Sequence, residues 1–435
     1  MTLLLFFLLN ATLFIRPAEI VPFFEGLPIY NLLILACLLL SMAKIIERMS
    51  VHSLFENPID ACVVGLFAAI PLSNLTHLNL EGASEGGVEF GKVVLYYFLL
   101  ISILDTPTKL IGFLRWLVGC IIILTTLALL QYHELIDIPA LQSIGDGETD
   151  PVTGQQFIVL RLCSTGIFHD PNDLCLILLF GMGISLFEMG RQGVGLRRFL
   201  WISPLILFGY ALTKTHSKGG FLAMLASMGV FSMARFGLKK TVPFGIIVLP
   251  VVLFLFAGRQ TQISTSEDTG QDRIQLWSAG IDLFRQSPLF GIGQHRYVEE
   301  VGLVAHNSFI HGFAELGILG GTLFAGAFYY ALATLQKLGP LRLLVADPEL
   351  SRLQPYLLAS VAAYATCLLA ISRNYVVPTY LILGLVSVYL RLATHGTSLR
   401  LLSVDSELAW RFLGIGGVFL IFAYLFVRTF ARFGA

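Results

Sequence analysis

The sequence predicts an all-α polytopic membrane protein, and its composition, its apolar runs and the placement of its charges all favour this class. Hydrophobic residues make up 56% of the 435 residues and charged residues 13%, and the mean hydropathy is +0.79. A soluble domain contains about 25% charged residues, so this composition is typical of a chain surrounded by lipid. Lysine plus arginine and aspartate plus glutamate each number 28, so only the distribution of charge is informative about partners.

Apolar runs separated by short polar segments predict twelve or thirteen transmembrane helices. Several runs are shorter than the roughly 20 residues that a straight spanning helix needs, so some of these helices are expected to be tilted or broken. The first run, MTLLLFFLLNATLFIRP, lacks a basic start and a small-residue cleavage site, which favours a retained span over a signal peptide. The runs lie near 2–15, 28–46, 59–75, 91–105, 108–130, 170–188, 196–213, 218–235, 242–258, 318–336, 353–372, 376–394 and 409–430.

We expect a single transmembrane domain over residues 1–435, because no soluble segment or internal repeat stands out among these runs. Most of the six cysteines lie inside apolar runs and none has CxxC spacing. They are therefore expected to be small core residues rather than a metal or redox set.

Lysine and arginine collect in alternate loops, and such loops face the cytoplasm. The opposite loops therefore face outward, and the first two of them are rich in acidic residues and poor in arginine. A thirteenth span would place Arg428 and Arg432 outside, so the helix count and the side of the C-terminus stay open. The basic loops contain Lys44/Arg48, Lys109/Arg115, Arg191/Arg197/Arg198, Lys239/Lys240 and Lys337/Arg342/Arg352, and the outer segments are 74–90, 131–169, 214–217, 259–305 and 373–375.

The outer segments nevertheless hold basic residues, several of them close to a helix end. Any single arginine or lysine there can extend to lipid phosphates, which is a purely structural explanation. Between 161 and 306, however, these residues lie in local sequences that point to a more specific role. The outer basic residues are Arg161, Lys214, Lys218, Arg259, Arg273, Arg285, Arg296 and Arg373.

The segment 161–180 contains a helix start at Asp170-Pro171-Asn172. Aspartate suits the cap, proline suits the first helical position, and Asp173 falls in the first turn, so a structural role of Asp170 is favoured over catalysis. Asp170 and Asp173 would need further carboxylates to hold a divalent ion, and the neighbouring motifs supply basic residues instead. No helix start requires Arg161.

A second helix start, THSKGG, lies at an outer helix end. Ser217 can cap this helix, and Gly219 and Gly220 allow a close backbone approach. The partial positive charge of the helix N-terminus and the full charge of Lys218 together suit an anion such as a phosphate. The glycine pair could equally serve helix packing.

The longest outer segment, 259–305, contains an apolar stripe of Ile274, Trp277, Ile281 and Phe284 at helical spacing. This pattern predicts an amphipathic helix that lies on the membrane surface and ends near Pro288. Membrane anchoring would use the tryptophan but does not require Arg273 at the helix start.

The stretch AHNSFIHGFAELGILGGT, 305–322, opens an apolar run with His306, Asn307, His311 and Glu315. A histidine titrates near neutral pH, so His306 can accept a proton from a hydroxyl. His311 lies ~140° round the helix from His306, which excludes one metal pair on one face, and we expect its replacement by alanine to affect activity only mildly. We expect Gly317, Gly320 and Gly321 to let the backbone break or pack closely. The polar part would then lie on the surface, and the spanning helix would begin after these glycines.

Five motifs in this order resemble the O-antigen ligase and O-antigen polymerase family, most strongly across 160–335. The resemblance implies a C-type glycosyltransferase-like bundle of about twelve helices with one larger periplasmic loop, here 259–305. It also implies an enzyme that uses neither a metal nor a nucleotide sugar, and a glycan donor linked to undecaprenyl diphosphate. The motifs are Arg161…Gly166…Asp170-Pro171-Asn172, Ser217-Lys218-Gly219, Arg273-x3-Trp277, Pro288-Leu289-Phe290-Gly291-Ile292-Gly293 and His306-Asn307-x9-Gly317-x2-Gly320.

Carried over motif by motif, the resemblance assigns diphosphate binding to Arg161, Lys218 and Arg273, and it assigns the acceptor hydroxyl to His306. The family more often has arginine at the position of Lys218, and lysine keeps the charge but loses the bidentate fork. The possible thirteenth helix is a second departure. Supporting roles would go to Asp170, Asn172, Asn307 and Trp277.

The sequence leaves several functions open. A ligase would transfer the glycan to a glycolipid and a polymerase to another lipid-linked repeat, both at the periplasmic face of the bacterial inner membrane. Polar groups and glycine-broken helices also occur in transporters, although here the ionisable residues concentrate at one face rather than at mid-membrane. A non-catalytic scaffold that binds glycolipids is a further alternative. The expected partners are the lipid-linked donor, the acceptor and membrane lipids, with no nucleic acid.

Overall fold

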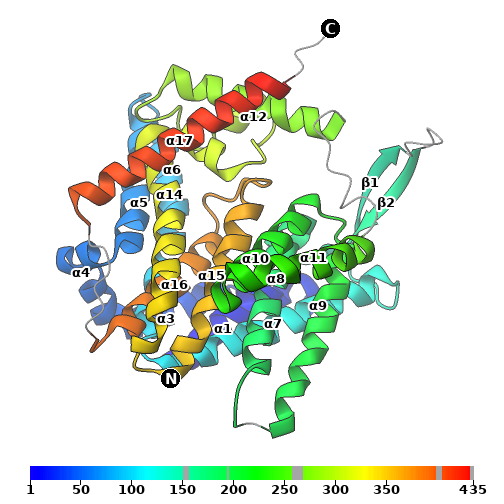
Figure 1. The fold of residues 1–435 in the computed structure, drawn as a ribbon. Helices are drawn as coiled ribbons and strands as arrows, with labels where there is room; N and C mark the ends of the chain where they lie inside the picture. The colour runs from blue at the N-terminus through cyan, green and yellow to red at the C-terminus, as the bar shows by residue number, and fades with distance from the viewer. Residues whose placement is uncertain (150–155, 194, 257–267, 398–403, 432–435) are drawn as a thin grey trace. The chain divides into compact units, whose positions relative to one another are not determined.

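The computed structural model describes residues 1–149, 156–193, 195–256, 268–397 and 404–431. Within these ranges the chain forms seventeen α-helices and one two-stranded hairpin (Figure 1), which confirms the predicted all-α class. Arg259, Arg432 and the first part of the predicted loop 259–305 lie outside the described residues.

Ten helices are long and apolar enough to cross a membrane, counted over the described part of the chain. The protein is therefore an integral membrane protein. The other three predicted runs overlap α1 (Thr2–Ile15), α9 (Ile202–Lys214) and α15 (Pro348–Cys367), which do not meet the same length and hydropathy limits. The ten are α3 (Ile29–Arg48), α5 (Pro58–Leu75), α6 (Leu80–Ile103), α7 (Pro107–Tyr132), α8 (Pro171–Met189), α10 (Lys218–Phe236), α11 (Leu238–Leu255), α14 (Ser308–Leu341), α16 (Val377–Thr394) and α17 (Ser406–Phe430).

The remaining elements are short or lie between the spans. They are α2 (Pro17–Ile20), α4 (Val51–Glu56), β1 (Ile144–Thr149), β2 (Gln156–Arg161), α12 (Asp268–Gln286) and α13 (Arg296–Val301). The chain divides into two compact units: the first comprises Met1–Leu40 and Thr106–Gln262, and the second comprises Ser41–Asp105 and Ile263–Ala435.

In the first unit, α7 packs against α1, α8 and α9. Phe6 of α1 stacks on Phe113 of α7, with ring centroids 5.3 Å apart. Arg115 of α7 makes two hydrogen bonds, of 2.8 and 3.1 Å, with the buried carboxylate of Glu188 in α8. Such a bidentate pair satisfies a charge that burial would otherwise destabilise, so it fixes α7 against α8.

The hairpin of the first unit is an element that the helical patterns do not predict. β1 and β2 pair antiparallel, with Ile144 opposite Arg161 and Asp146 opposite Val159. It places Arg161 at the end of a strand rather than in an irregular loop.

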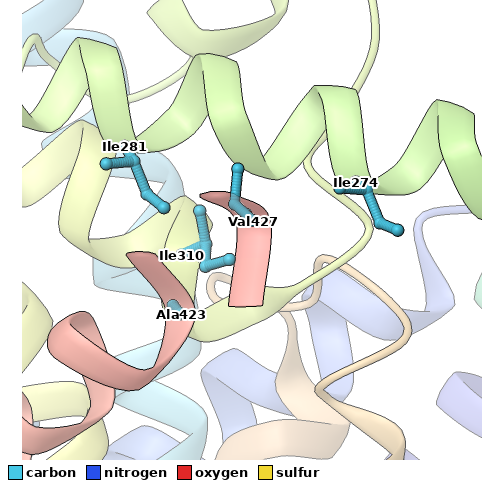
Figure 2. Packing of buried hydrophobic residues seen from close by; sticks show 5 residues of the cluster. All are labelled: Ile274, Ile281, Ile310, Ala423 and Val427. Atoms are coloured by element: carbon cyan, nitrogen blue, oxygen red, sulfur yellow. The ribbon is translucent and has the colours of Figure 1, made fainter. Parts of the chain in front are cut away.

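In the second unit, α14 packs against α5, α12, α15 and α17. Ile274 and Ile281 of α12 pack against Ile310 of α14 and against Ala423 and Val427 of α17 (Figure 2). The expectation that the apolar stripe of this amphipathic helix faces the membrane is therefore wrong, because neighbouring helices cover the stripe. All six cysteines are buried, which confirms the prediction that they are core residues.

Candidate functional site

Two capped helix starts meet in the first unit. The Asp170 carboxylate accepts hydrogen bonds of 2.8 Å from the backbone N–H and from the side-chain amide of Asn172, at the start of α8. At the start of α10, the Ser217 hydroxyl accepts a hydrogen bond of 2.9 Å from the backbone N–H of Gly220. It also donates a hydrogen bond of 2.5 Å to the Asn172 side-chain oxygen. Both predicted caps are confirmed. Helix N-termini carry partial positive charge, which Asp170 and Asp173 offset at α8. The neutral Ser217 cap leaves this charge in place at the start of α10, and an anion is favoured there.

Arg161 lies beside these helix starts. Its Nε donates a 3.1 Å hydrogen bond to the Thr215 carbonyl, three residues before Lys218. Its Nη1 lies 3.3 Å from an Asp146 oxygen on β1, and its side chain is only 13% exposed. The structure thus brings Arg161, Asp170 and Asn172 to the Ser217-Lys218 turn, where Lys218 is half-buried.

Gly220 and Gly166 lie where a larger side chain would clash with a neighbouring residue. A Cβ at Gly220 would lie 2.4 Å from the Cys175 sulfur of α8, so the close helix approach predicted for the glycine pair is present. Gly166 has a φ of +57°, and a Cβ there would lie 2.2 Å from Nε of Arg16. The Glu19 carboxylate forms an ion pair of 2.6 Å with Arg16 and accepts a hydrogen bond of 2.9 Å from the Gly166 N–H.

Arg16 is thus a cation of this region that the sequence patterns do not single out. It directly follows the first apolar run, and that position was the available signal. Its contact with Gly166 becomes visible only in the folded chain.

In the second unit, the helix α14 is broken at Gly317, whose φ of 63° and ψ of −162° are not helical. The Pro288–Gly293 motif lies along this break. The N–H of Ile292 donates a hydrogen bond of 3.0 Å to the Ala314 carbonyl, and the N–H of Ile318 donates one of 2.8 Å to the Pro288 carbonyl. Backbone groups released by the break are thereby satisfied, as a membrane helix requires. The predicted break is confirmed.

Glycine is required on both sides of this contact. A Cβ at Gly317 would lie 2.5 Å from the Leu289 carbonyl group, and a Cβ at Gly291 would lie 2.2 Å from the Glu315 carbonyl group. The fourth and fifth motifs are therefore two halves of one backbone-to-backbone contact.

His306 and Asn307 immediately precede α14. The Asn307 side-chain oxygen caps the helix by accepting hydrogen bonds of 3.0 Å from the Phe309 N–H and 3.2 Å from the Ile310 N–H. His306 is half-buried and has a φ of 48°, in the left-handed region. A residue other than glycine adopts this region only where its surroundings impose it, and such residues cluster at functional sites.

Arg273 and Trp277 lie one turn apart on α12. Arg273 is half-buried and precedes Ile274 of the apolar cluster. The Trp277 ring packs 5.8 Å from that of Phe426, and its buried Nε1 has no hydrogen-bond partner within the described residues. The tryptophan therefore packs against α17 rather than anchoring α12 in lipid.

A buried polar cluster around Glu315 is the feature that the sequence patterns miss. The Glu315 side chain is 0% exposed. Its carboxylate accepts hydrogen bonds of 2.8 Å from the Tyr375 hydroxyl and 3.3 Å from the Tyr297 N–H. A carboxylate oxygen also lies 3.1 Å from Nε2 of His311. Burial, and then the Glu315 charge, raise the pKa of the Tyr375 hydroxyl, which stays protonated and donating.

The expected surface position of the polar part of α14 is therefore wrong. Ser308, His311, Glu315 and the residues between them are largely buried, and the helix already begins at Ser308. The i, i+4 spacing of His311 and Glu315 could have indicated the pair. Tyr297 and Tyr375 come from distant segments and carry no sequence signal for this contact.

His311→Ala is expected to lower the stability of the protein, whatever its effect on activity. The Glu315 carboxylate would lose one of its buried partners, which costs about 1–3 kcal/mol, and the ring stacked 4.9 Å from Tyr297 would leave a cavity. The measurement is thermal unfolding of the purified variant in detergent.

His52→Ala is the matched control, because His52 and Glu56 have the same i, i+4 spacing at 3.2 Å but are 86% and 68% exposed. An exposed pair contributes little, so this variant should unfold near the wild-type temperature. Equal losses in the two variants would contradict the role of burial.

Within the described residues, no three histidine, cysteine or acidic side chains are grouped as metal ligands. Asp170 acts as a cap, as interpreted from the sequence. The phosphate-binding roles of Arg161, Lys218 and Arg273, and the role of His306, stay predictions.

Comparison with known proteins identifies the region that contains most of these residues. Residues 204–325 match the family model described as O-Antigen ligase. The match extends from α9 into α14 and contains Lys218, Arg273 and His306, whereas Arg161 precedes it. No curated protein matches the chain. The family resemblance predicted from the motifs is confirmed: residues 204–325 of this integral membrane protein match the O-antigen ligase family.

Proposed function

We propose that this protein transfers a preassembled glycan from undecaprenyl diphosphate to an acceptor hydroxyl, as an O-antigen ligase does. The active site would face the periplasm from the bacterial inner membrane. The observation that carries the proposal is the pair of capped helix starts beside Arg161 and Lys218. The family match supports O-antigen ligase or polymerase chemistry in general.

The reaction divides into two tasks for the side chains. The acceptor oxygen bonds to the anomeric carbon of the glycan while the bond from that carbon to the diphosphate oxygen breaks. Arg161, Lys218 and Arg273 would bind the diphosphate of the donor and stabilise the further negative charge that develops on it as it leaves. His306 would take the proton from the acceptor hydroxyl.

A polymerase is the second candidate, because the family resemblance covers both activities. The same groups would then act on the same donor, and the acceptor would be another lipid-linked repeat instead of a glycolipid. The choice of acceptor therefore separates the two functions, and the donor-side residues do not.

The test uses purified protein in detergent with a donor whose glycan is labelled. We expect labelled product and free undecaprenyl diphosphate to form in equal amounts, only when an acceptor is added. A glycolipid acceptor that suffices would support a ligase, and a lipid-linked repeat that suffices would support a polymerase. A protein that releases no lipid diphosphate with any acceptor, yet moves a solute across proteoliposomes, would make the transporter alternative correct.

We also expect transfer to persist in excess EDTA. Fixed arginine and lysine side chains can stabilise a diphosphate leaving group without a divalent ion. The measurement is the initial rate of transfer with and without chelator, at matched ionic strength because the exposed part of the site is screened by salt. A rate that collapses with EDTA and returns with Mg²⁺ or Mn²⁺ would require Asp170 and Asp173 to be reconsidered as ligands.

A further inference from the structure

We propose that the hairpin β1–β2 rests on the lipid bilayer through the side chains of Ile158 and Leu160, in the leaflet on the side where Arg161 lies. The face formed by these two residues is called the apolar hairpin face. This inference depends on the protein being embedded in a membrane and is independent of the reaction it catalyses.

The apolar hairpin face has no cover from its own partner strand. Side chains alternate along a strand, so Ile158 and Leu160 lie on the same face of β2. The residues opposite them on β1 are Gly147 and Gly145, which bring no side chain. Ile158 is 74% exposed and Leu160 is 51% exposed. An isolated two-stranded hairpin is marginally stable in water, and one with bare isoleucine and leucine requires an apolar partner.

The other face of the hairpin, called the charged face, carries its charged residues together with apolar ones. Asp146 and Arg161 form an ion pair of 3.3 Å there, across from the face of Ile158 and Leu160. Val159, Phe157 and Ile144 share this second face, with Phe157 47% and Ile144 37% exposed. A hairpin with one wholly apolar face and one face that carries an ion pair suits the boundary between lipid and water, as an interfacial amphipathic helix does.

The base of the hairpin contacts the C-terminal ends of α7 and α9. The hydroxyl of Tyr132, the last residue of α7, lies 3.5 Å from the Leu160 carbonyl. The N–H of Leu162 donates a hydrogen bond of 2.9 Å to the carbonyl of Lys214, the last residue of α9. The Lys214 ammonium lies 5.9 Å from the ring centroid of Tyr132 and 5.3 Å from that of Tyr210.

Tyrosine and lysine at helix ends mark the headgroup layer of a membrane. Each strand residue advances about 3.3 Å, so Ile158 lies roughly 7 Å along the strand from Leu160. The polar layer on each side of a bilayer is roughly 5–8 Å thick. A hairpin that lies against the bilayer would therefore bring its apolar face within reach of the acyl boundary.

Lipid is the occupant that these contacts favour, because the belt of Tyr132, Tyr210 and Lys214 is continuous with the base of the hairpin. Leu160 is followed directly by Arg161. Docking of Leu160 would hold the Arg161 guanidinium at the depth where a phosphate carried on a lipid lies.

The test uses an environment-sensitive fluorophore on Ile158→Cys in proteoliposomes. The six native cysteines are buried, so the new thiol reacts selectively, and unlabelled wild type measures the background. Lipids with a nitroxide on the headgroup or high on the acyl chain serve as quenchers. Val159→Cys, on the charged face, is the matched control, and Leu160→Cys is a second probe if Ile158→Cys does not fold.

We expect nitroxide lipids to quench the label at 158 or 160 at least twofold more than the label at 159, and an aqueous iodide quencher to show the opposite order. Equal lipid quenching at 158 and 159 would overturn the proposal. A label at 158 that is protected from both lipid and aqueous quenchers would also overturn it, because a protein partner would then cover the face.

Discussion

His306→Ala is expected to abolish glycan transfer while the protein still inserts in the membrane. A positioned general base typically contributes 10²–10⁴-fold to a rate, so the residual activity should be about 1% or less. The left-handed backbone at His306 tolerates the substitution only with some strain. The measurement is the rate of acceptor-dependent release of undecaprenyl diphosphate by purified protein.

The control is His295→Ala, because His295 is also in the left-handed region but pairs with Glu89 at the surface. It carries the same kind of backbone strain without the proposed chemistry, so its rate should stay near that of wild type. Comparable rates for His306→Ala and wild type would remove His306 from the mechanism.

Arg161→Ala is expected to lower donor-dependent activity by about 30-fold or more. Loss of a charged contact to a phosphate costs ~2–5 kcal/mol, and 1.4 kcal/mol is about one decade. The loss should appear mainly in the apparent affinity for the donor. Arg273→Ala should behave in the same way, whereas Lys218→Arg should be tolerated or improve binding, because it restores a bidentate fork.

Arg161 also holds structure, so its partner provides the control. Asp146→Asn removes the 3.3 Å ion pair and keeps Arg161 with its 3.1 Å hydrogen bond to Thr215. We expect this variant to retain most of the activity, since Asp146 has no proposed contact with the donor. Equal losses in Asp146→Asn and Arg161→Ala would show that the arginine acts only through the hairpin.

Local signals in the sequence predicted the features that depend on neighbouring residues. Asp170 and Ser217 cap helices as their positions indicate, because a cap is a contact over two or three residues. The break at Gly317 follows from glycine at a position with a φ of 63°. The spans follow from composition, since lipid requires long apolar helices.

Features that join distant segments could not be predicted in this way. The stripe of Ile274 and Ile281 matches both a membrane surface and a helical neighbour, and only the contact with Ala423 and Val427 decides between them. The local sequence suggests that Glu315 is an exposed polar residue near a helix end. Its carboxylate is instead hydrogen-bonded to Tyr375, which is sixty residues away in the sequence. Tertiary packing supplied both answers.

The most direct test of the division of labour between cations and base is equilibrium binding of the labelled donor to wild type, His306→Ala and Arg161→Ala without acceptor. If the basic residues hold the diphosphate and His306 serves only the acceptor, His306→Ala should bind the donor within about twofold of wild type. The Kd of Arg161→Ala should rise by about 30-fold or more, as expected for a lost phosphate contact. Equal donor affinity in all three proteins, or a loss confined to His306→Ala, would contradict the account.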